Sequence, residues 1–176
     1  AGTCAHPDIP GRAVPYFVME YIPDARPITR FTAEKNLGTQ ERLTLFETVC
    51  DAVHFGHQKG IIHRDLKPAN ILVDAAGKVK IIDFGVARST DSDVAVTTLR
   101  TDLGQLIGTL QYMSPEQAAG DADAIDVRSD VYALGVILYE LLTGALPYDV
   151  TGQPLHAALR TICEKPPLNP RALNRA

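Results

Sequence analysis

The sequence predicts an α+β fold that is mainly helical and carries one small β-hairpin. Three patterns support this prediction: an amphipathic segment at residues 39–58, an almost wholly apolar segment at residues 128–142, and two short apolar runs at residues 71–73 and 79–82. Long periodic segments are typical of helices, whereas short apolar runs around a turn are typical of paired strands. We therefore expect helices to form most of the domain.

The first long helix is predicted to pack on the core through one face. Its apolar residues recur at helical spacing, while charged residues fall elsewhere. His54 and His57 lie three residues apart on it. A histidine pair without a carboxylate or cysteine is more often a core and a surface residue than a metal site, so we assign these two no function. The positions at helical spacing are Phe46, Val49, Cys50, Val53 and His57.

The second long helix is apolar nearly all round, which predicts that it is buried at the centre of the domain. Gly144 and Pro147 are expected to end it. A shorter helix is expected near residues 155–163, and a capped helical turn should start at residues 114–116, where a serine precedes proline and an acid.

Composition and charge argue against several classes of protein. The 176 residues, with a net charge of −4, have the composition of one ordinary soluble domain. Acidic and basic residues are interspersed, so no basic stripe for nucleic acid and no polybasic segment for lipid is evident. Three widely spaced cysteines favour a reducing, cytoplasmic location over a disulfide framework or a zinc site. Neither a signal peptide nor a bilayer-spanning segment is evident, so we expect no membrane contact.

A polar loop carries the strongest functional signal. Residues 63–70 hold an acid, two bases and an amide, and we expect the apolar runs at residues 61–62 and 71–73 to support this loop as strands. Catalytic geometry requires such rigid support. The strand expected at residues 79–82 has a similar arrangement, because it is followed by Asp83 and then by a turn at a glycine.

The residue types in these two loops suit phosphoryl transfer. The carboxylate of Asp83 and the amide oxygen of Asn70 are ligands that Mg²⁺ prefers, and Mg²⁺ usually reaches proteins together with phosphates. Asp65 remains to accept a proton from an incoming hydroxyl, while Lys67 can neutralise charge on a transferred phosphoryl group. Solvated loop charges would explain any one of these residues alone, but they explain the set poorly.

These motifs resemble those of protein kinases. The run His-Arg-Asp-Leu-Lys-Pro-Ala-Asn at residues 63–70 is similar to the kinase catalytic loop, and Asp-Phe-Gly at residues 83–85 is similar to the magnesium loop. Residues 108–116 resemble the substrate-facing segment that ends in Ala-Pro-Glu, with Ser114 in place of alanine. Over nearly its whole length the chain resembles bacterial members of the eukaryotic-type serine/threonine kinases. The resemblance implies a protein-kinase-like fold, and transfer of the γ-phosphate of Mg-ATP to Ser or Thr hydroxyls of a protein substrate.

The resemblance also assigns roles to the polar residues. It implies that Asp65 is the base or hydroxyl-orienting group and that Lys67 neutralises the phosphate. Asn70 and Asp83 would be the magnesium ligands. Thr109 matches the position that bridges the catalytic aspartate and lysine in serine/threonine kinases, and it would therefore face the substrate.

An adenine site is implied near the front of the chain. Residues 16–22 match the last small-lobe strand and the hinge, and the glycine- and proline-rich stretch before them is expected to be a turn. Met19 would take the gatekeeper position, and the backbone of Glu20 and Ile22 would face adenine. Leu72 matches the residue that forms the apolar floor beneath the base, although plain core packing would also explain it.

Residues 86–113 form a long polar stretch without sustained periodicity, which is typical of a functional loop and matches the kinase activation segment. Arg64, beside the catalytic aspartate, could bind a phosphate there with two hydrogen bonds. We hypothesise that phosphorylation of Thr97, Thr98 or Thr101 orders the loop through Arg64. For any single threonine, a solvated loop with incidental hydroxyls is nearly as good an explanation.

The resemblance divides the chain into a small-lobe remnant at residues 1–22 and an incomplete large lobe at residues 23–176. The sequence shows no glycine loop over the phosphates, no strand lysine and no helix glutamate, which position ATP in kinases. It also stops before the arginine that usually pairs with the acid at Glu116. We therefore expect the isolated chain to be weak or inactive and the parent protein to be active. In the large lobe, Asp130 matches the residue that ties the catalytic-loop backbone to the start of its helix.

Two alternatives to an active kinase remain open. The chain could be a truncated, non-catalytic pseudokinase that serves as an interaction module, or a regulator that binds ATP without transferring phosphate. Decayed active sites usually lose a metal or base residue, and none is lost here.

Overall fold

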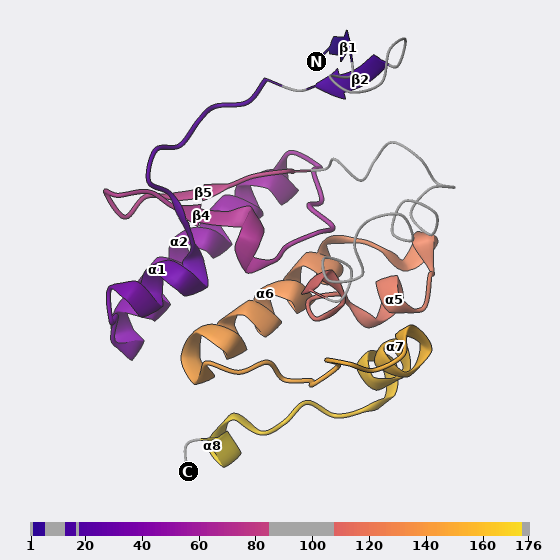
Figure 1. Cartoon of the computed structure of the whole chain (residues 1–176). Coiled ribbons are helices and arrows are strands. Elements are labelled where there is room, and N and C mark those ends of the chain that lie inside the picture. Colours follow the sequence, from indigo (N-terminus) through magenta and orange to yellow (C-terminus); the bar gives the residue numbers. More distant parts are fainter. Residues whose placement is uncertain (1, 6–12, 17, 85–107, 174–176) are drawn as a thin grey trace.

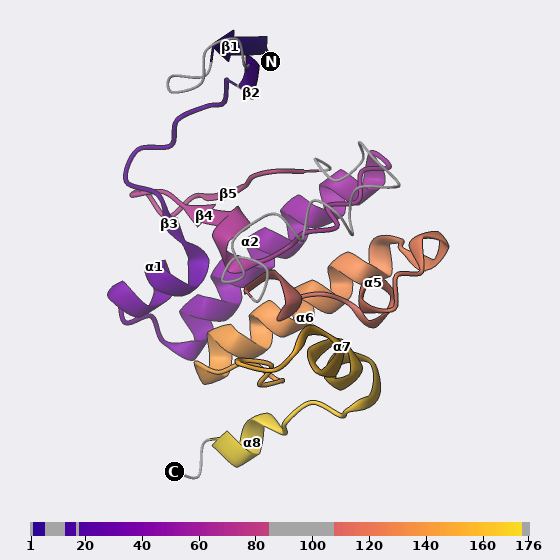
Figure 2. The same ribbon diagram turned by 45° about the vertical axis from the view of Figure 1, so that its right-hand side comes forward.

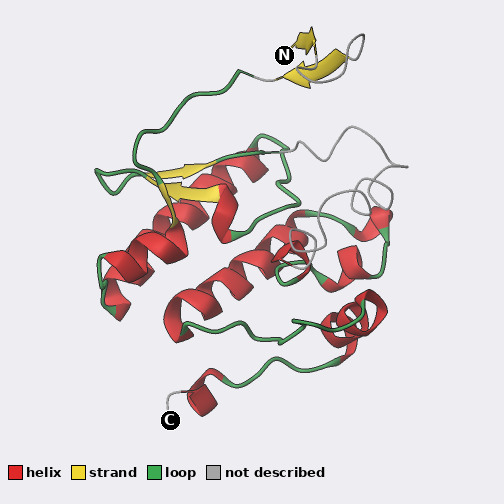
Figure 3. Ribbon diagram, viewed as in Figure 1, coloured by secondary structure: helices red, strands yellow, loops and turns green. Residues whose placement is uncertain are grey.

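The structure is a computed structural model and describes residues 2–5, 13–16, 18–84 and 108–173 (Figure 1). It confirms the predicted α+β fold, with helices forming most of the molecule and a small sheet beside them (Figure 3). The helices are α1 (Ile28–Glu34), α2 (Thr39–Gln58), α5 (Pro115–Ala118), α6 (Val127–Thr143), α7 (Leu155–Glu164) and α8 (Pro170–Leu173), with 3-10 turns η1 (Pro68–Asn70) and η3 (Ala122–Ala124). The strands are β1 (Gly2–Ala5), β2 (Ala13–Tyr16), β3 (Arg26–Pro27), β4 (Ile71–Val73) and β5 (Val79–Ile81).

The predicted hairpin is confirmed and gains a third strand. β4 pairs antiparallel with β5, and on its other side it pairs with β3, which the sequence analysis did not predict. Ile71 and Val73 are buried, whereas Leu72 between them is only partly buried, as expected for side chains that alternate across a sheet. The sheet therefore packs one face of β4 on the core and turns Leu72 toward the opposite face.

The two long helices form the centre of the molecule, and both are confirmed. α2 and α6 lie side by side in both views (Figures 1 and 2). Three of the residues predicted at helical spacing, Phe46, Val49 and Val53, are buried. α6 ends at Thr143, and its C-cap Gly144 has a φ of 71°, the left-handed conformation that a glycine adopts at low cost. The main core holds Ile28, Leu45, Phe46, Val49, Val53, Leu66, Ile71, Val73, Ala133, Leu134, Ile137 and Leu141.

The expectation that α6 is buried at the centre of the domain is confirmed for one side of the helix only. The side of this helix that carries Ile137 is buried, but Val131 is 59% exposed. Val131, Leu134 and Leu138 line an apolar groove between α2 and α6. A helix can be apolar on every side yet buried only where another element covers it, and the described residues place no element over this groove.

The expected strand at residues 16–22 is wrong. β2 ends at Tyr16, and residues 18–22 have no regular structure, with Val18 and Tyr21 both 83% exposed. The stretch expected to be a turn instead contains β1 and part of β2, paired from Gly2 with Tyr16 to Ala5 with Ala13. A strand is stabilised by a pairing partner, and β1 supplies one only as far as Tyr16.

Residues 61–62 do not form the strand that the sequence predicts before the polar loop. They lie in a loop, because the N–H of Ile61 donates to the carbonyl oxygen of Gly56 at 3.0 Å and so completes the end of α2. The polar loop is thus held by a helix end on one side and by β4 on the other. Residues 108–110, part of the stretch expected to be irregular, are helical.

The elements near the C-terminus agree with prediction. α7 covers the expected helix, and α5 begins with Ser114 as its N-cap, whose Oγ accepts from the N–H of Gln117. A second apolar cluster, formed by Leu110, Val150, Ala158 and Ile162, joins α7 to the segment before α5. None of the helices in the described parts of the chain has the length and apolar character needed to cross a bilayer.

Candidate active site

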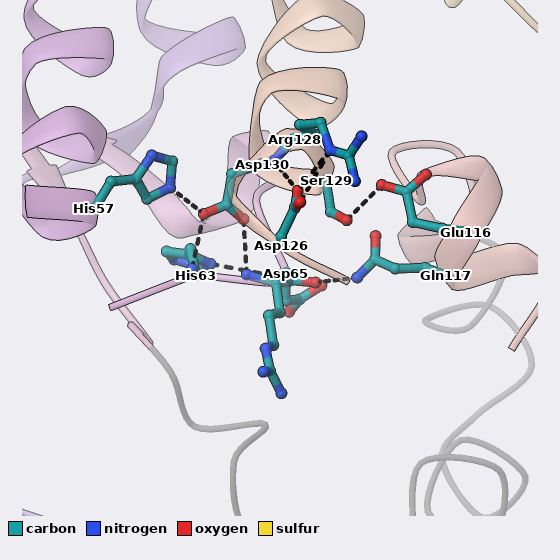
Figure 4. Close-up of polar contacts among 10 residues, drawn as sticks. His57, His63, Asp65, Glu116, Gln117, Asp126, Arg128, Ser129 and Asp130 are labelled. Atoms are coloured by element: carbon teal, nitrogen blue, oxygen red, sulfur yellow. Dashed lines mark hydrogen bonds and ion pairs between the residues drawn. The ribbon is translucent and has the colours of Figure 1, made fainter. Parts of the chain in front are cut away.

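The polar loop is held in place by a buried carboxylate at the start of α6. Asp130 is only 1% exposed, and its two oxygens accept hydrogen bonds from the backbone N–H groups of His63 and Arg64, both at 2.8 Å (Figure 4). Such bonds satisfy a buried charge that would otherwise be costly. The implied link between Asp130 and the catalytic-loop backbone is therefore confirmed.

His57 adds a third bond to the same carboxylate. Its Nε2 lies 2.6 Å from Oδ2 of Asp130, which connects α2 to α6 at the base of the loop (Figure 4). The sequence places His57 on the core side of its helix but indicates no role for it. Spacing alone cannot pair a histidine with a residue 73 positions away.

His63 is a second residue that the sequence analysis did not single out, although it begins the loop motif. It is fully buried, and its Nε2 lies 2.9 Å from the carbonyl oxygen of Ile82 while its Nδ1 lies 3.3 Å from the N–H of Asp65. Because the carbonyl needs a donor and the N–H needs an acceptor, these partners specify the neutral Nε2–H tautomer. Its ring also meets that of Phe84 edge-on, with centroids 4.8 Å apart. His63 thus joins the two loops that carry Asp65 and Asp83.

Asp65, Lys67 and Thr109 meet in one cluster. Nζ of Lys67 lies 2.9 Å from Oδ2 of Asp65 and donates a hydrogen bond to Oγ1 of Thr109 at 3.0 Å. Thr109 comes from a segment 42 residues away in sequence from Lys67. The ammonium group therefore joins the loop to the segment before α5, and the partly exposed Asp65 carboxylate remains accessible to a reactant.

Asn70 fixes the same aspartate from the other side. Its Nδ2 donates to the backbone oxygen of Asp65 at 2.8 Å and lies 3.2 Å from Oδ2 of that residue. Its own backbone oxygen accepts a hydrogen bond from the N–H of Ile82 at 2.9 Å. Because the amide nitrogen of Asn70 contacts Asp65, its side-chain oxygen is the atom that would face a cation.

Asp83 follows directly after Ile82 and is exposed. Its φ of 60° is unusual for a residue other than glycine, and Arg64 in the other loop has a similar φ of 68°. Backbone strain of this kind persists where surrounding contacts impose it, and it is common at functional sites. Both loops therefore adopt a strained conformation next to a proposed functional side chain.

A small pocket opens beside the cluster, lined in part by Asp65, Thr109, Tyr112 and Met113. The hydroxyl of Tyr112 donates to Oε2 of Glu140 on α6 at 2.6 Å. Burial raises the pKa of Glu140, and the bond from Tyr112 offsets part of that increase. The pKa of Tyr112 is raised as well, first by burial and then by the neighbouring carboxylate.

α5 is attached to the same region by two neighbouring residues. Oγ of Ser129 donates to Oε1 of Glu116 at 2.5 Å, and Nε2 of Gln117 donates to the backbone oxygen of Arg64 at 2.7 Å (Figure 4). Burial raises the pKa of Glu116, but hydrogen bonds, chiefly from Ser129, outweigh this and leave the pKa below its usual value.

The residues proposed to bind adenine are not all brought together. Met19 is 69% exposed, in the segment that links β2 to the helical body, and Ile22 lies in the same segment. The carboxylate of Glu20 contacts β5, with its Oε1 3.3 Å from Nζ of Lys80. Leu72 lies in the neighbouring strand β4, on the face opposite its buried neighbours. Of this set, Glu20 and Leu72 are thus brought to the same small sheet.

The regulatory hypothesis stays a prediction. Arg64 lies in the loop, held through its backbone by Asp130 and Gln117. Thr97, Thr98 and Thr101 lie outside the described residues.

Comparisons with known proteins agree with the motifs. A family model described as protein kinase domain matches residues 12–169. A serine/threonine-protein kinase PknB from Mycobacterium leprae is 43% identical over 153 residues, which cover 87% of this chain and 24% of that protein. The PknB of Mycobacterium tuberculosis is 43% identical over 161 residues, with coverage of 90% and 24%. That of Mycolicibacterium smegmatis is 39% identical over 160 residues, with the same coverage. The chain thus spans about a quarter of the length of these curated relatives, 24% in each case.

Proposed function

Because this chain belongs to the protein kinase domain family, we propose that the protein it is part of transfers the γ-phosphate of Mg-ATP to Ser or Thr hydroxyls of a protein substrate. The observation that carries this proposal is the cluster in which Lys67 contacts both Asp65 and Thr109. The relatives bear the name serine/threonine-protein kinase, which supports the same acceptor class.

In the proposed reaction, Asp65 orients the acceptor hydroxyl and accepts its proton as the hydroxyl oxygen attacks the γ-phosphorus of ATP. The bond from that phosphorus to the bridging oxygen breaks, and ADP leaves. A general base must lie within hydrogen-bond reach of that proton, and the partial exposure of the Asp65 carboxylate beside the small pocket supports this role. Lys67 holds this carboxylate and supplies positive charge where negative charge grows on the transferred group. Asn70 keeps the Asp65 backbone fixed during the step.

The donor set of the two loops fits a magnesium ion bound to nucleotide phosphates. Mg²⁺ prefers oxygen ligands and commonly takes only one or two from the protein, the others coming from phosphate and water. Asp83 offers an exposed carboxylate, and Asn70 offers its side-chain oxygen. The Ile82-to-Asn70 backbone bond links the loops that carry them. When bound, the ion would neutralise charge on the phosphate oxygens.

The nucleotide base is proposed to lie against the sheet, between Leu72 below and the segment of Met19, Glu20 and Ile22 above. The exposure of Leu72 away from the core supports this placement. We also propose the division into a small-lobe remnant at residues 1–22 and a large lobe from residue 23 onward. It is supported by Figures 1 and 2, where β1 and β2 lie apart from the helical body.

Regulation through Arg64 remains a proposal of the same kind. Phosphorylation of Thr97, Thr98 or Thr101 would supply the phosphate that the guanidinium binds. Replacing all three threonines with alanine in the complete protein should lower phosphotransfer several-fold, and unchanged transfer would refute this regulation.

The proposed function is tested by incubating the complete protein with magnesium, ATP labelled at its γ-phosphate and a peptide mixture that contains Ser, Thr and Tyr acceptors. We expect label on phosphoserine and phosphothreonine, lost when magnesium is removed with a chelator. Label on phosphotyrosine alone would contradict the acceptor class. Nucleotide binding without any transfer would instead support the non-catalytic alternative.

A further inference from the structure

Gln117, in the first turn of α5, uses both ends of its side-chain amide. Its Oε1 accepts hydrogen bonds from the backbone N–H and from Oγ of Ser114, both at 3.1 Å. Its Nε2 donates to the carbonyl oxygen of Arg64 at 2.7 Å (Figure 4). A carbonyl oxygen can only accept and a backbone N–H can only donate, so these partners determine which end of the amide faces the loop.

The bond from Gln117 is one of two hydrogen bonds that hold the backbone of Arg64, the residue just before Asp65. We call these two bonds, from Asp130 and Gln117, the clamp. Arg64 has the unfavourable φ of 68°, so its conformation must be imposed by contacts. Its N–H donates to Asp130 on α6 at 2.8 Å, and its carbonyl oxygen accepts from Gln117 on α5 at 2.7 Å. These two bonds fix the peptide planes on both sides of Arg64, and each comes from a different helix.

The second of these planes, between Arg64 and Asp65, sets the direction in which the Asp65 side chain projects from the loop. The carbonyl of Arg64 and the N–H of Asp65 belong to one planar peptide group. Gln117 holds one edge of that group, and Nδ1 of His63 lies 3.3 Å from the N–H on its other edge. Catalytic side chains need to be held within roughly 0.5 Å of their working position, so a rotation of this plane would matter.

Ser114 connects this clamp to the substrate-facing segment. The segment at residues 108–114 carries Thr109 and ends at the Ser114 N-cap, whose N–H and Oγ bind the opposite end of the same amide. A shift of α5 would therefore be transmitted through one rigid planar group to the peptide before Asp65.

We propose that Gln117 is a positioning residue that couples the substrate-facing segment to the orientation of Asp65. The proposal rests on the proposed phosphotransfer, in which Asp65 acts on the acceptor hydroxyl. Gln117 itself contacts no reacting atom, so its effect is expected in kcat rather than in the binding of ATP.

The variant Gln117→Glu in the complete protein provides a sharp test, because the carboxylate keeps an acceptor for Ser114 but cannot donate to Arg64 at neutral pH. We expect kcat to fall at pH 7.5 by about tenfold or more, because a small displacement of a catalytic group slows the reaction strongly. The KM for ATP should be unchanged. A glutamic acid titrates at about 4.3 in model peptides, and an adjoining carbonyl oxygen raises that value, so acidification restores a donor. The ratio of variant to wild-type kcat should therefore rise as the pH falls toward 5.5.

A matched control is Gln40→Glu, which makes the same change at an exposed position of α2. Its kcat ratio to wild type should stay flat across the pH range. A Gln117→Glu variant that matches wild type at every pH, or that loses activity without any recovery on acidification, would overturn the proposal.

A second measurement does not depend on catalysis. Gln117→Met keeps the length of the side chain but removes both polar ends, and amide hydrogen exchange can be followed without substrate. We expect faster exchange at Asp65 and Leu66, with unchanged exchange in the buried part of α2. Unchanged exchange in the loop would refute the clamp, whereas a wild-type protein without phosphotransfer would refute only the proposed function.

Discussion

Nε2 of His57 lies 2.6 Å from Oδ2 of Asp130, so a histidine on α2 and a carboxylate on α6 meet beneath the polar loop. The same carboxylate accepts the N–H groups of His63 and Arg64. Three donors from two separate segments thus converge on one buried side chain. This arrangement explains how two packed helices can hold a loop that has no strand before it.

Asp130→Ala should therefore be strongly destabilising. It would leave the buried N–H of His63, the N–H of Arg64 and the His57 ring without their acceptor, and each unsatisfied buried group costs about 1–3 kcal/mol. We expect the free energy of unfolding to fall by about 3 kcal/mol or more, measured by urea denaturation of the complete kinase domain.

Asp126→Ala is the matched control on the same helix. Asp126 caps α6 by accepting from the N–H of Arg128 at 2.7 Å, but its side chain is 46% exposed, in contrast to the buried Asp130. Loss of an exposed N-cap costs about 1 kcal/mol. If Asp130→Ala lowers the free energy of unfolding no more than Asp126→Ala does, the buried network adds little stability.

Two helix glycines should respond in opposite ways to alanine. A Cβ on Gly56 of α2 would lie 2.8 Å from Cε1 of Phe84, whereas a Cβ on Gly135 of α6 would meet no heavy atom within 4 Å. Gly135→Ala should raise the free energy of unfolding by about 0.5–1 kcal/mol, because alanine favours helix. Gly56→Ala should instead displace Phe84, next to Asp83, and lower phosphotransfer.

Thermal denaturation together with the phosphotransfer assay separates these two effects. Equal stabilisation by both alanines, with full activity retained, would mean that Phe84 can move freely and that its contact with α2 does not support the Asp83 loop.

Glu140→Gln should change the pH dependence of stability. Burial raises the pKa of Glu140 in the folded chain above its unfolded value, so the folded state binds the proton more tightly. Ionisation of Glu140 therefore lowers the free energy of unfolding. This loss of stability is absent below the unfolded pKa of about 4.3 and grows as pH rises through the folded pKa. Glutamine carries no charge and can still accept the hydroxyl of Tyr112.

The stability difference between Glu140→Gln and wild type should accordingly shift in favour of the variant between pH 4.5 and pH 7.5. Urea denaturation at several pH values within this range provides the measurement. A difference that is constant, or that shifts in favour of wild type as pH rises, would show that burial does not dominate at this carboxylate.

Asp83→Asn should weaken the use of magnesium, because an amide oxygen is a poorer ligand for a hard cation than a carboxylate. We expect the magnesium concentration for half-maximal transfer to rise by about tenfold or more. The control is Asp74→Asn in the hairpin turn, where Oδ1 accepts from the N–H groups of Ala76 and Lys78 and an asparagine oxygen can do the same. An identical magnesium requirement in both variants would remove Asp83 from the proposed ligand set.

Much of the fold could be predicted because it is encoded locally. The periodicity of α2, the apolar length of α6 and the turn between β4 and β5 are visible in neighbouring residues, and all three are confirmed. The wrong predictions are those that depend on a pairing partner elsewhere in the chain. Residues 18–22 and 61–62 have the composition of strands, but the described structure pairs neither stretch with another strand.

The candidate site divides in the same way. Asp65, Lys67 and Asn70 could be proposed from one short motif, and the structure brings them together. His57 and Gln117 could not, because their partners Asp130 and Arg64 are 73 and 53 residues away in sequence. The serine and glutamine at positions 114 and 117 did contain a usable signal, since Ser-x-x-Gln is a capping-box pattern.

The most direct test of the central claim is the rate of phosphoryl transfer by the Asp65→Ala variant of the complete protein. Asp65 is partly exposed, so the variant should remain folded, as judged by an unchanged unfolding midpoint. We predict that transfer to Ser and Thr acceptors is abolished while ATP still binds. Transfer at the wild-type rate by the folded variant would contradict the assignment of Asp65 and, with it, the proposed mechanism.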